Sequence, residues 1–523
     1  MTTSHDERAA GEGAGERPQP VGIFSPPAGL LLVPGDPPGQ GSPSAADDGS
    51  DEVRASLLQG RLPATWPPSL EPLRLAFAGD REGALAALDG MAADSPLWRY
   101  DRWVLDPDGG DPAEVAEALP RELTALVGVV QYQLGRAAAP PVDLPEETAP
   151  EVRAIVLSAR AAACLEDEDP AGAIDTLRAA AEAAGDSSPV LGAMLRGDRA
   201  SVAADAGLDL TLEAGGGDTV HELLAAADAL QGRDLDEARA ELLLRAGGVR
   251  QELASHAGDP GVLRQRLREA MQCYYDGLQL VSEESSPQLW AMLNLNLAAA
   301  QMAVPMQRAS DQLRLGVATQ ALRACRRVFT PEQHPAHWST ATLNLANALV
   351  YTPSTHQGDN LVEAVELYEE VIASGVRDDD PLGRARLLAN QGNVLAHLGA
   401  FDPARTKLVD ARYLFEEHGD DDAVRTVRGV LDEIARAEVG DPDEELADLA
   451  RQSEQMARMP QGDGAYRAGM GVQVLADLEA QAPPTPVVTV VDPASRPTPS
   501  PVVDGADGDL AAVPGSAERG EGG

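Results

Sequence analysis

The sequence predicts an all-α fold, a solenoid of helical hairpins with disordered N- and C-terminal tails. Ala, Leu and Arg are abundant among the 523 residues and only 3% are aromatic. This composition favours helices, because Ala, Leu and Arg lose little freedom on entering one. Helical stretches alternate with short Gly, Asp and Pro loops, as in TVHELLAAADALQGRDLDEARAELLLRAG. A chain of this length is too long for one compact core and fits an elongated array.

Composition divides the chain into five regions. The two ends are rich in Gly, Pro, Ser and Asp, and we expect both to be disordered. The apolar runs AGLLLVPG near the start and PVVTVV near the end could dock on a partner, although a chance run in a flexible tail is the favoured interpretation. The expected regions are a disordered tail over 1–50, degenerate helical hairpins over 51–284, regular repeats with a capping helix over 285–437, a helical extension over 438–480 and a disordered tail over 481–523.

The formal net charge of −43 limits the classes of partner. So acidic a surface repels phosphate backbones and anionic lipid, so we expect neither nucleic-acid nor membrane binding. A basic partner would be attracted. The alternative is that the acidic residues serve only to keep a large protein soluble.

Cysteine usage and targeting signals predict a cytoplasmic protein. Three widely spaced cysteines show no CxxC pair, which suits reduced thiols better than a disulfide framework. The N-terminus MTTSHDERAAGEG lacks a signal-peptide core, and no apolar run is long enough to span a membrane. Lys407 is the only lysine among many arginines, a bias typical of GC-rich bacterial genomes.

An internal repeat is visible in the second half of the chain. Three segments begin with a proline, at Pro287, Pro335 and Pro381, and each is followed by a second predicted helix. Proline suits the first turn of a helix, where its missing N–H has no partner. Nine residues after the proline each segment has an asparagine, and two residues further a small residue; these are Asn296 and Ala298, Asn344 and Ala346, and Asn390 and Gly392.

These units resemble the tetratricopeptide repeat (TPR). In the third unit the small and large residues of that family's pattern are Gly392, Leu395, Gly399, Ala404, Leu408 and Ala411. The second unit matches at Ala346, Leu349, Ala364 and Tyr368 but is longer between its helices, as in a bacterial variant with long repeats. The resemblance covers roughly residues 285–435. It implies stacked hairpins with a concave groove that binds a protein or peptide segment.

The asparagines divide into two predicted groups. We expect Asn296, Asn344 and Asn390 to be structural, hydrogen-bonding the backbone or neighbouring helices and fixing helix register. The resemblance places Asn347 and Asn393 on the groove wall, where such amides bind a partner's backbone, with side chains one turn before and after. The predicted groove residues are Thr340, Asn347, Tyr351, Arg386, Asn393 and His397. A solvated, unused groove is the alternative.

The predicted groove does not suit a carboxylate-binding co-chaperone. Some TPR proteins bind a C-terminal carboxylate through lysines and arginines, but the matching positions here are Leu295, Leu343 and Ala389. A basic or apolar partner segment fits better.

Catalytic and metal-binding patterns are weak. His334, His337 and His356 lack an acidic residue at ligand spacing, and the Asp runs at 378–380 and 420–422 are expected to cap helices. No phosphate-binding or nucleophile motif is present, and Cys273 and Cys325 fit core packing. We therefore predict a non-catalytic scaffold or adaptor without cofactor or metal. The alternatives are a sensor that regulates a separately encoded enzyme and, more remotely, a metal-dependent enzyme using Asp379 and Asp421.

Overall fold

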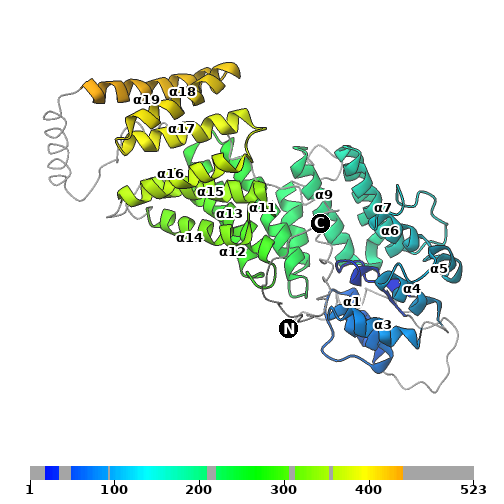
Figure 1. Ribbon diagram of the computed structural model, residues 1–523. Coiled ribbons are helices and arrows are strands. Elements are labelled where there is room, and N and C mark those ends of the chain that lie inside the picture. The colour runs from blue at the N-terminus through cyan, green and yellow to red at the C-terminus, as the bar shows by residue number, and fades with distance from the viewer. Residues whose placement is uncertain are drawn as a thin grey trace, which may run out of the picture. The chain divides into compact units, whose positions relative to one another are not determined.

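A computed structural model describes residues 18–34, 49–91, 95–208, 219–304, 312–352 and 357–439 (Figure 1). The all-α fold class is confirmed, since the strands in these ranges form one short antiparallel pair. The elements before the repeats are β1 (Gln19–Pro20), η1 (Ala28–Leu30), β2 (Leu32–Val33), α1 (Ser50–Leu58), η2 (Pro68–Leu70), α2 (Glu71–Phe77), α3 (Arg81–Asp89), α4 (Pro96–Leu105), α5 (Pro112–Ala118) and α6 (Ala125–Gln133).

From α7 onward each helix packs against the next one in the chain, as Figure 1 shows. The helices are α7 (Pro150–Glu166), α8 (Pro170–Ala184), α9 (Pro189–Asp205), α10 (Thr219–Ala229), α11 (Asp236–Ser255), α12 (Pro260–Leu278), α13 (Pro287–Ala303), α14 (Gln312–Val328), α15 (Pro335–Tyr351), α16 (Gln357–Ser374), α17 (Pro381–His397), α18 (Phe401–Glu417) and α19 (Asp421–Val439); η3 (Gly185–Ser187) links α8 to α9. We call α7, α9, α11, α13, α15 and α17 the first helices, and the helix after each its second helix.

The first helices share one register. Five of them open with a proline, and α11 opens with Asp236. Eleven residues after the opening residue lies a small buried residue, which is Ala161, Ala200, Gly247, Ala298, Ala346 or Gly392. At Gly247 an added Cβ would lie 2.4 Å from Cε1 of Tyr274 on the second helix, so the helices cross too closely for any side chain. The register therefore begins at Pro150, far upstream of the three units that the sequence revealed.

The second helices carry a matching pattern of buried residues. Each has one residue facing the crossing point, another four residues later and a third seven residues later. These triplets are Ala173, Leu177 and Ala180; Thr219, Leu223 and Ala226; Ala270, Tyr274 and Gly277; Ala318, Leu322 and Cys325; Ala364, Tyr368 and Val371; and Ala404, Leu408 and Ala411. Six hairpins thus repeat the same pattern of buried residues, and the chain forms a TPR-like array of helical hairpins.

The two kinds of helix form different layers. First helices contact one another directly, as α9 does α11, α11 does α13 and α13 does α15. Second helices are bridged by long charged side chains: Arg323 with Glu363 at 2.8 Å between α14 and α16, and Lys407 with Glu369 at 2.9 Å between α18 and α16. We call the side of the stack on which the first helices lie its inner side. We call their solvent-facing stripe the inner face.

The N-terminal expectation needs a correction. Residues 18–34 were expected to be disordered, but Val21, Leu31 and Leu32 are completely buried. The apolar residues of the run AGLLLVPG, which its composition assigned to a flexible tail, pack instead in the core of the chain. Its strand β2 contacts α4, and β1 contacts α7, so tertiary burial overrides the local Gly- and Pro-rich composition.

At the other end α19, which covers the expected capping helix, packs against α18 and α17. The expected extension over 438–480 lies outside the described residues apart from the end of α19, and the expected tail over 481–523 lies wholly outside them. Within the described ranges, no helix is both long and apolar enough to cross a membrane.

Candidate binding face

The inner face of α15 and α17 is defined by helix register. Counting from the opening proline, Thr340, Asn344, Asn347 and Tyr351 follow one side of α15 at successive turns. Thr340, Asn344 and Tyr351 are half-buried, whereas Asn347 is only 7% exposed. On α15 the predicted groove residues Thr340 and Tyr351 are thus partly accessible, whereas Asn347 is buried and Asn344 is partly accessible instead.

Asn347 lies inside its hairpin. Its Oδ1 accepts a hydrogen bond from Tyr368 Oη on α16, at 2.5 Å. A similar contact one turn further along the first helix occurs in the α11–α12 hairpin, where Tyr274 Oη donates to Gln251 Oε1 at 3.1 Å. A buried tyrosine hydroxyl needs an acceptor, and the first helix supplies it. The predicted groove role of Asn347 is thus replaced by one that joins the two helices.

On α17 both asparagines are buried. Asn393 is 3% exposed and Asn390 is 7% exposed, so the predicted groove amide of this helix is also covered. Arg386 is half-buried and His397 is exposed, both on the inner-face stripe. The structure therefore leaves a cationic side chain and an imidazole accessible at the two ends of α17.

The predicted structural ladder of Asn296, Asn344 and Asn390 is uneven. Asn296 Nδ2 donates to the carbonyl of Met292 at 3.0 Å, within its own helix. Asn390 Oδ1 is buried and has no protein partner. Asn344 is half-buried and stands on the inner face. The partly accessible amide on this side of α15 is thus Asn344, not the predicted Asn347.

Tyr368→Phe is expected to lower the free energy of unfolding by about 1–2 kcal/mol, because it deletes a buried hydrogen bond but little volume. Tyr413→Phe, on an exposed side chain of α18 (65% exposed), should change it by less than about 0.5 kcal/mol. Urea unfolding followed by circular dichroism measures both. Equal stabilities for Tyr368→Phe and the unaltered protein would contradict the structural role of Asn347.

The histidines near the start of α15 pack against an aromatic ring. His337 stacks on Phe329 with ring centroids 4.9 Å apart, and His334 meets the same ring edge-on at 5.4 Å. Burial, and then the neighbouring His334, lower the pKa of His337, which favours its neutral form. His334 Nε2 lies 3.1 Å from Gln288 Nε2 on α13. His356 lies outside the described residues.

The Asp runs act at helix starts. Asp380 Oδ1 accepts the N–H of Gly383 at 2.8 Å, and Asp420 Oδ1 accepts that of Ala423 at 3.1 Å. Asp378 pairs with Arg384. Among the residues described, no group of three or more His, Cys, Asp or Glu side chains is arranged to hold a metal ion. The capping interpretation of both runs is confirmed.

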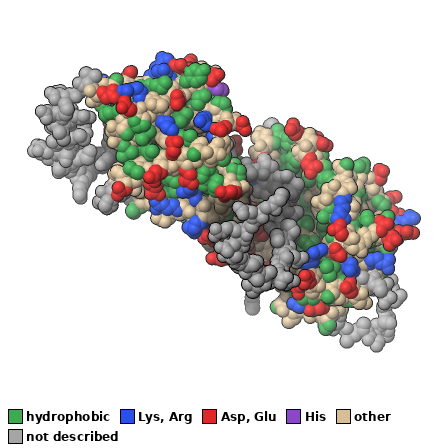
Figure 2. All heavy atoms as spheres, viewed as in Figure 1, with side chains coloured by type: hydrophobic (Ala, Val, Ile, Leu, Met, Phe, Trp, Pro, Cys, Tyr) green, Lys and Arg blue, Asp and Glu red, His purple; other side chains and the backbone are tan. Residues whose placement is uncertain are grey.

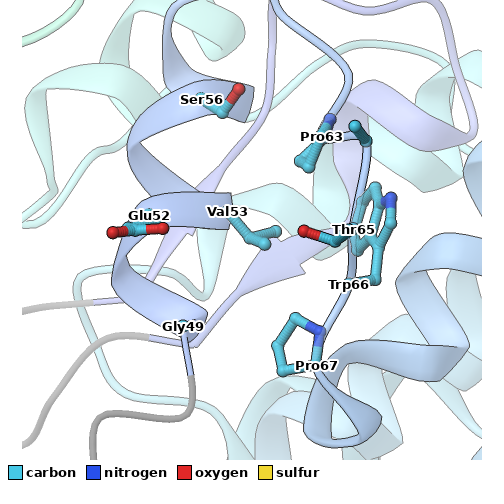
Figure 3. Close-up of a pocket in the computed structure, with 9 residues that line it drawn as sticks. Gly49, Glu52, Val53, Ser56, Pro63, Thr65, Trp66 and Pro67 are labelled. Atoms are coloured by element: carbon cyan, nitrogen blue, oxygen red, sulfur yellow. The ribbon is translucent and has the colours of Figure 1, made fainter.

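A pocket of about 390 Å³ lies apart from this face, between α1 and the loop that follows it (Figure 3). Val53 and Thr65 face each other across it, Trp66 lies on the loop side, and Glu52 is the one charged residue lining it. No sequence motif pointed to this pocket, whose lining also includes Ser56.

No family model and no curated protein matches the sequence. Among solved structures, the crystal structure of a Rap protein complexed with competence and sporulation factor is similar over 71% of this chain and 97% of that one. Its sequence identity is 12% and the TM-score is 0.36. The assignment to a TPR-like array therefore rests on the helix register and crossing residues of the chain itself.

Proposed function

We propose that the protein is a non-catalytic scaffold whose inner face on α15 and α17 binds a segment of a protein partner. One observation carries this proposal. Thr340, Asn344 and Tyr351 are half-buried along one side of α15, and Arg386 and His397 are accessible at the corresponding ends of α17. Amide, phenol, guanidinium and imidazole groups suit recognition of a peptide backbone and its side chains, and Tyr and Arg commonly dominate binding energies.

The charge of the chain favours a basic or apolar partner segment. Acidic and basic side chains are interspersed on the face seen in Figure 2, but the net charge is strongly negative. Several cations are engaged in ion pairs with acidic neighbours, such as Arg326 with Glu370 at 2.8 Å. Long-range attraction would therefore speed association of a cationic partner, while the inner-face contacts would supply specificity. A sensor that controls a separately encoded enzyme would use the same face.

The test compares a triple variant of inner-face residues with a triple variant of exposed residues outside that face, which we call the outer variant. Asn344→Ala, Tyr351→Ala and Arg386→Ala together remove an amide, a phenol and a guanidinium from the inner face. Gln320→Ala, Tyr413→Ala and Arg425→Ala remove comparable groups from exposed positions on α14, α18 and α19. A partner captured by the unaltered protein, then purified, should bind the inner-face variant at least tenfold more weakly.

The outer variant should bind that partner as the unaltered protein does. Circular dichroism must first show that both variants are equally helical. Unchanged affinity of the inner-face variant in calorimetry, or an equal loss in both variants, would reject the inner face as the binding site.

A further inference from the structure

The inner face of the first two hairpins is covered by the chain's own N-terminal segment. Ile155 stands five residues after Pro150, the same register as Thr340 and Arg386 in later repeats. An added Cβ at Gly22 would lie 2.8 Å from Ile155 Cδ1 on α7 and 3.7 Å from Leu191 Cδ2 on α9. The backbone of Gly22 thus rests directly on two successive first helices, at a register position that is open in the later repeats.

The segment 18–34 fits this face as an extended apolar ligand would. It is built from two short paired strands joined by a turn, and Val21, Leu31, Leu32 and Val33 are all completely buried. The turn needs Gly29, because a Cβ there would lie 2.0 Å from the carbonyl oxygen of Phe24. The main contribution to docking is therefore apolar burial. Gly29 allows the main chain to make the close turn between the strands.

Polar contacts hold the segment at one side. Leu32 N donates to Asp101 Oδ1 of α4 at 2.8 Å. The other oxygen, Asp101 Oδ2, is buried without a hydrogen-bond partner, as is the hydroxyl of the adjacent Tyr100. A buried polar group without a hydrogen-bond partner destabilises the folded state. These unsatisfied groups thus oppose the stabilisation that apolar burial gives to the contact between the segment and α4.

The covering extends to the start of the third hairpin. Asp234 N donates to the carbonyl of Gly60 at 2.8 Å, and Leu62 N donates to Asp234 Oδ2 at 2.7 Å. An added Cβ at Gly60 would meet both Leu235, which precedes α11, and Ile23 of the segment. The loop after α1 and the segment therefore also contact the residues that immediately precede α11.

We propose that residues 18–34 are an intramolecular ligand that occupies the inner face of the first two hairpins and leaves it as a unit. While docked, the segment restricts partner binding to the later repeats. When it leaves, Ile155 and Leu191 join the open inner face, which then accepts an extended apolar partner segment along more repeats. The effect on partner binding rests on the function proposed for α15 and α17, whereas the docking and release of the segment do not depend on it.

Hydrogen exchange on the full chain tests whether the segment opens by itself. Amides of residues 18–34, including that of Leu32, should exchange through a local opening with a lower free energy than amides in the middle of α15. The opposite result is that amides of the segment and of α15 exchange only through one shared unfolding event, with the same dependence on denaturant. That result would show that the segment belongs permanently to the core, and it would overturn the proposal.

A peptide added in trans tests whether the site accepts a ligand. The probe is a labelled synthetic peptide with the sequence of residues 18–34. In the unaltered chain the tethered segment competes with it at high effective concentration. Gly22→Leu in the full chain drives a side chain into Ile155 and weakens the tethered copy. The peptide should bind this variant at least tenfold more tightly than the unaltered chain.

The matched control is a peptide that itself carries Gly22→Leu, which should not bind. If a folded Gly22→Leu chain bound neither peptide, or bound both equally, the inner face of the first two hairpins would not be a ligand site for this segment. Hydrogen exchange on the unaltered chain keeps the proposal falsifiable if that variant does not fold.

Discussion

Gly247→Ala is expected to lower the free energy of unfolding by about 2 kcal/mol, whereas Gly316→Ala should raise it by about 1 kcal/mol. Both glycines are inside helices. At Gly247 the new methyl group would lie 2.4 Å from Cε1 and 2.8 Å from Cζ of the buried Tyr274 ring. The ring would have to move, which would disturb its hydrogen bond to Gln251. At Gly316 nothing lies within 4 Å, so only the helix preference of alanine remains.

The opposite signs make this pair a test of the shared helix crossing. Urea unfolding of the two single variants, followed by far-UV circular dichroism, measures the difference. Gly392→Ala should resemble Gly247→Ala, since its Cβ would lie 2.7 Å from Leu408 Cγ. If Gly247→Ala stabilised the protein as much as Gly316→Ala does, α11 and α12 would not form the same hairpin as α17 and α18.

Asp101→Asn is expected to stabilise the protein at neutral pH and to reduce the dependence of its stability on pH. Burial raises the pKa of Asp101 well above its usual range, and the hydrogen bond from Leu32 N only partly opposes this. The folded state therefore holds this proton more tightly than the unfolded state does. Protonation of Asp101 therefore stabilises the folded state at low pH. This stabilisation is lost as pH rises from the unfolded-state pKa of about 4 through the raised pKa of the folded state. Asparagine keeps an acceptor for Leu32 N–H without that charge.

Thermal unfolding between pH 5 and pH 8 measures this effect. The melting temperature of the unaltered protein should fall relative to that of Asp101→Asn as pH increases. Asp143→Asn, at an exposed position, controls for the loss of one surface charge. A constant difference between Asp101→Asn and the unaltered protein across this range would contradict a buried, proton-binding Asp101.

The sequence predicted the fold well because its strongest signal is local. Prolines at helix starts and small residues at helix crossings recur at fixed spacing, and both reflect backbone geometry that every hairpin must satisfy. The earlier hairpins were predicted only as degenerate ones, and their shared register was not recognised for identifiable reasons. Asp236 stands where the other first helices have proline, and the α9–α10 triplet begins with Thr219 instead of alanine. Searching for a small residue eleven positions after Pro150 and Pro189 would have found two more units.

The inner face was only partly predictable. Helix periodicity places Thr340, Asn344, Asn347 and Tyr351 on one side of α15, but it does not decide which asparagine is covered. Tyr368 on the next helix decides it, by donating its hydroxyl to Asn347. The docked segment 18–34 was missed for a similar reason. Its composition is typical of a disordered tail, and its order depends on apolar contacts with residues far away in the sequence, such as Ile155.

Site-specific photo-crosslinking in cells would test the central claim most directly. A photoreactive residue would replace Thr340, Tyr351 or Arg386 on the inner face, or Gln320 or Tyr413 on the second helices. The binding account predicts that the three inner-face positions cross-link to the same short segment of one partner, whereas the two second-helix positions do not. Cross-links to a partner from Gln320 or Tyr413, with none from the inner-face positions, would place the binding site on the opposite layer and contradict the account.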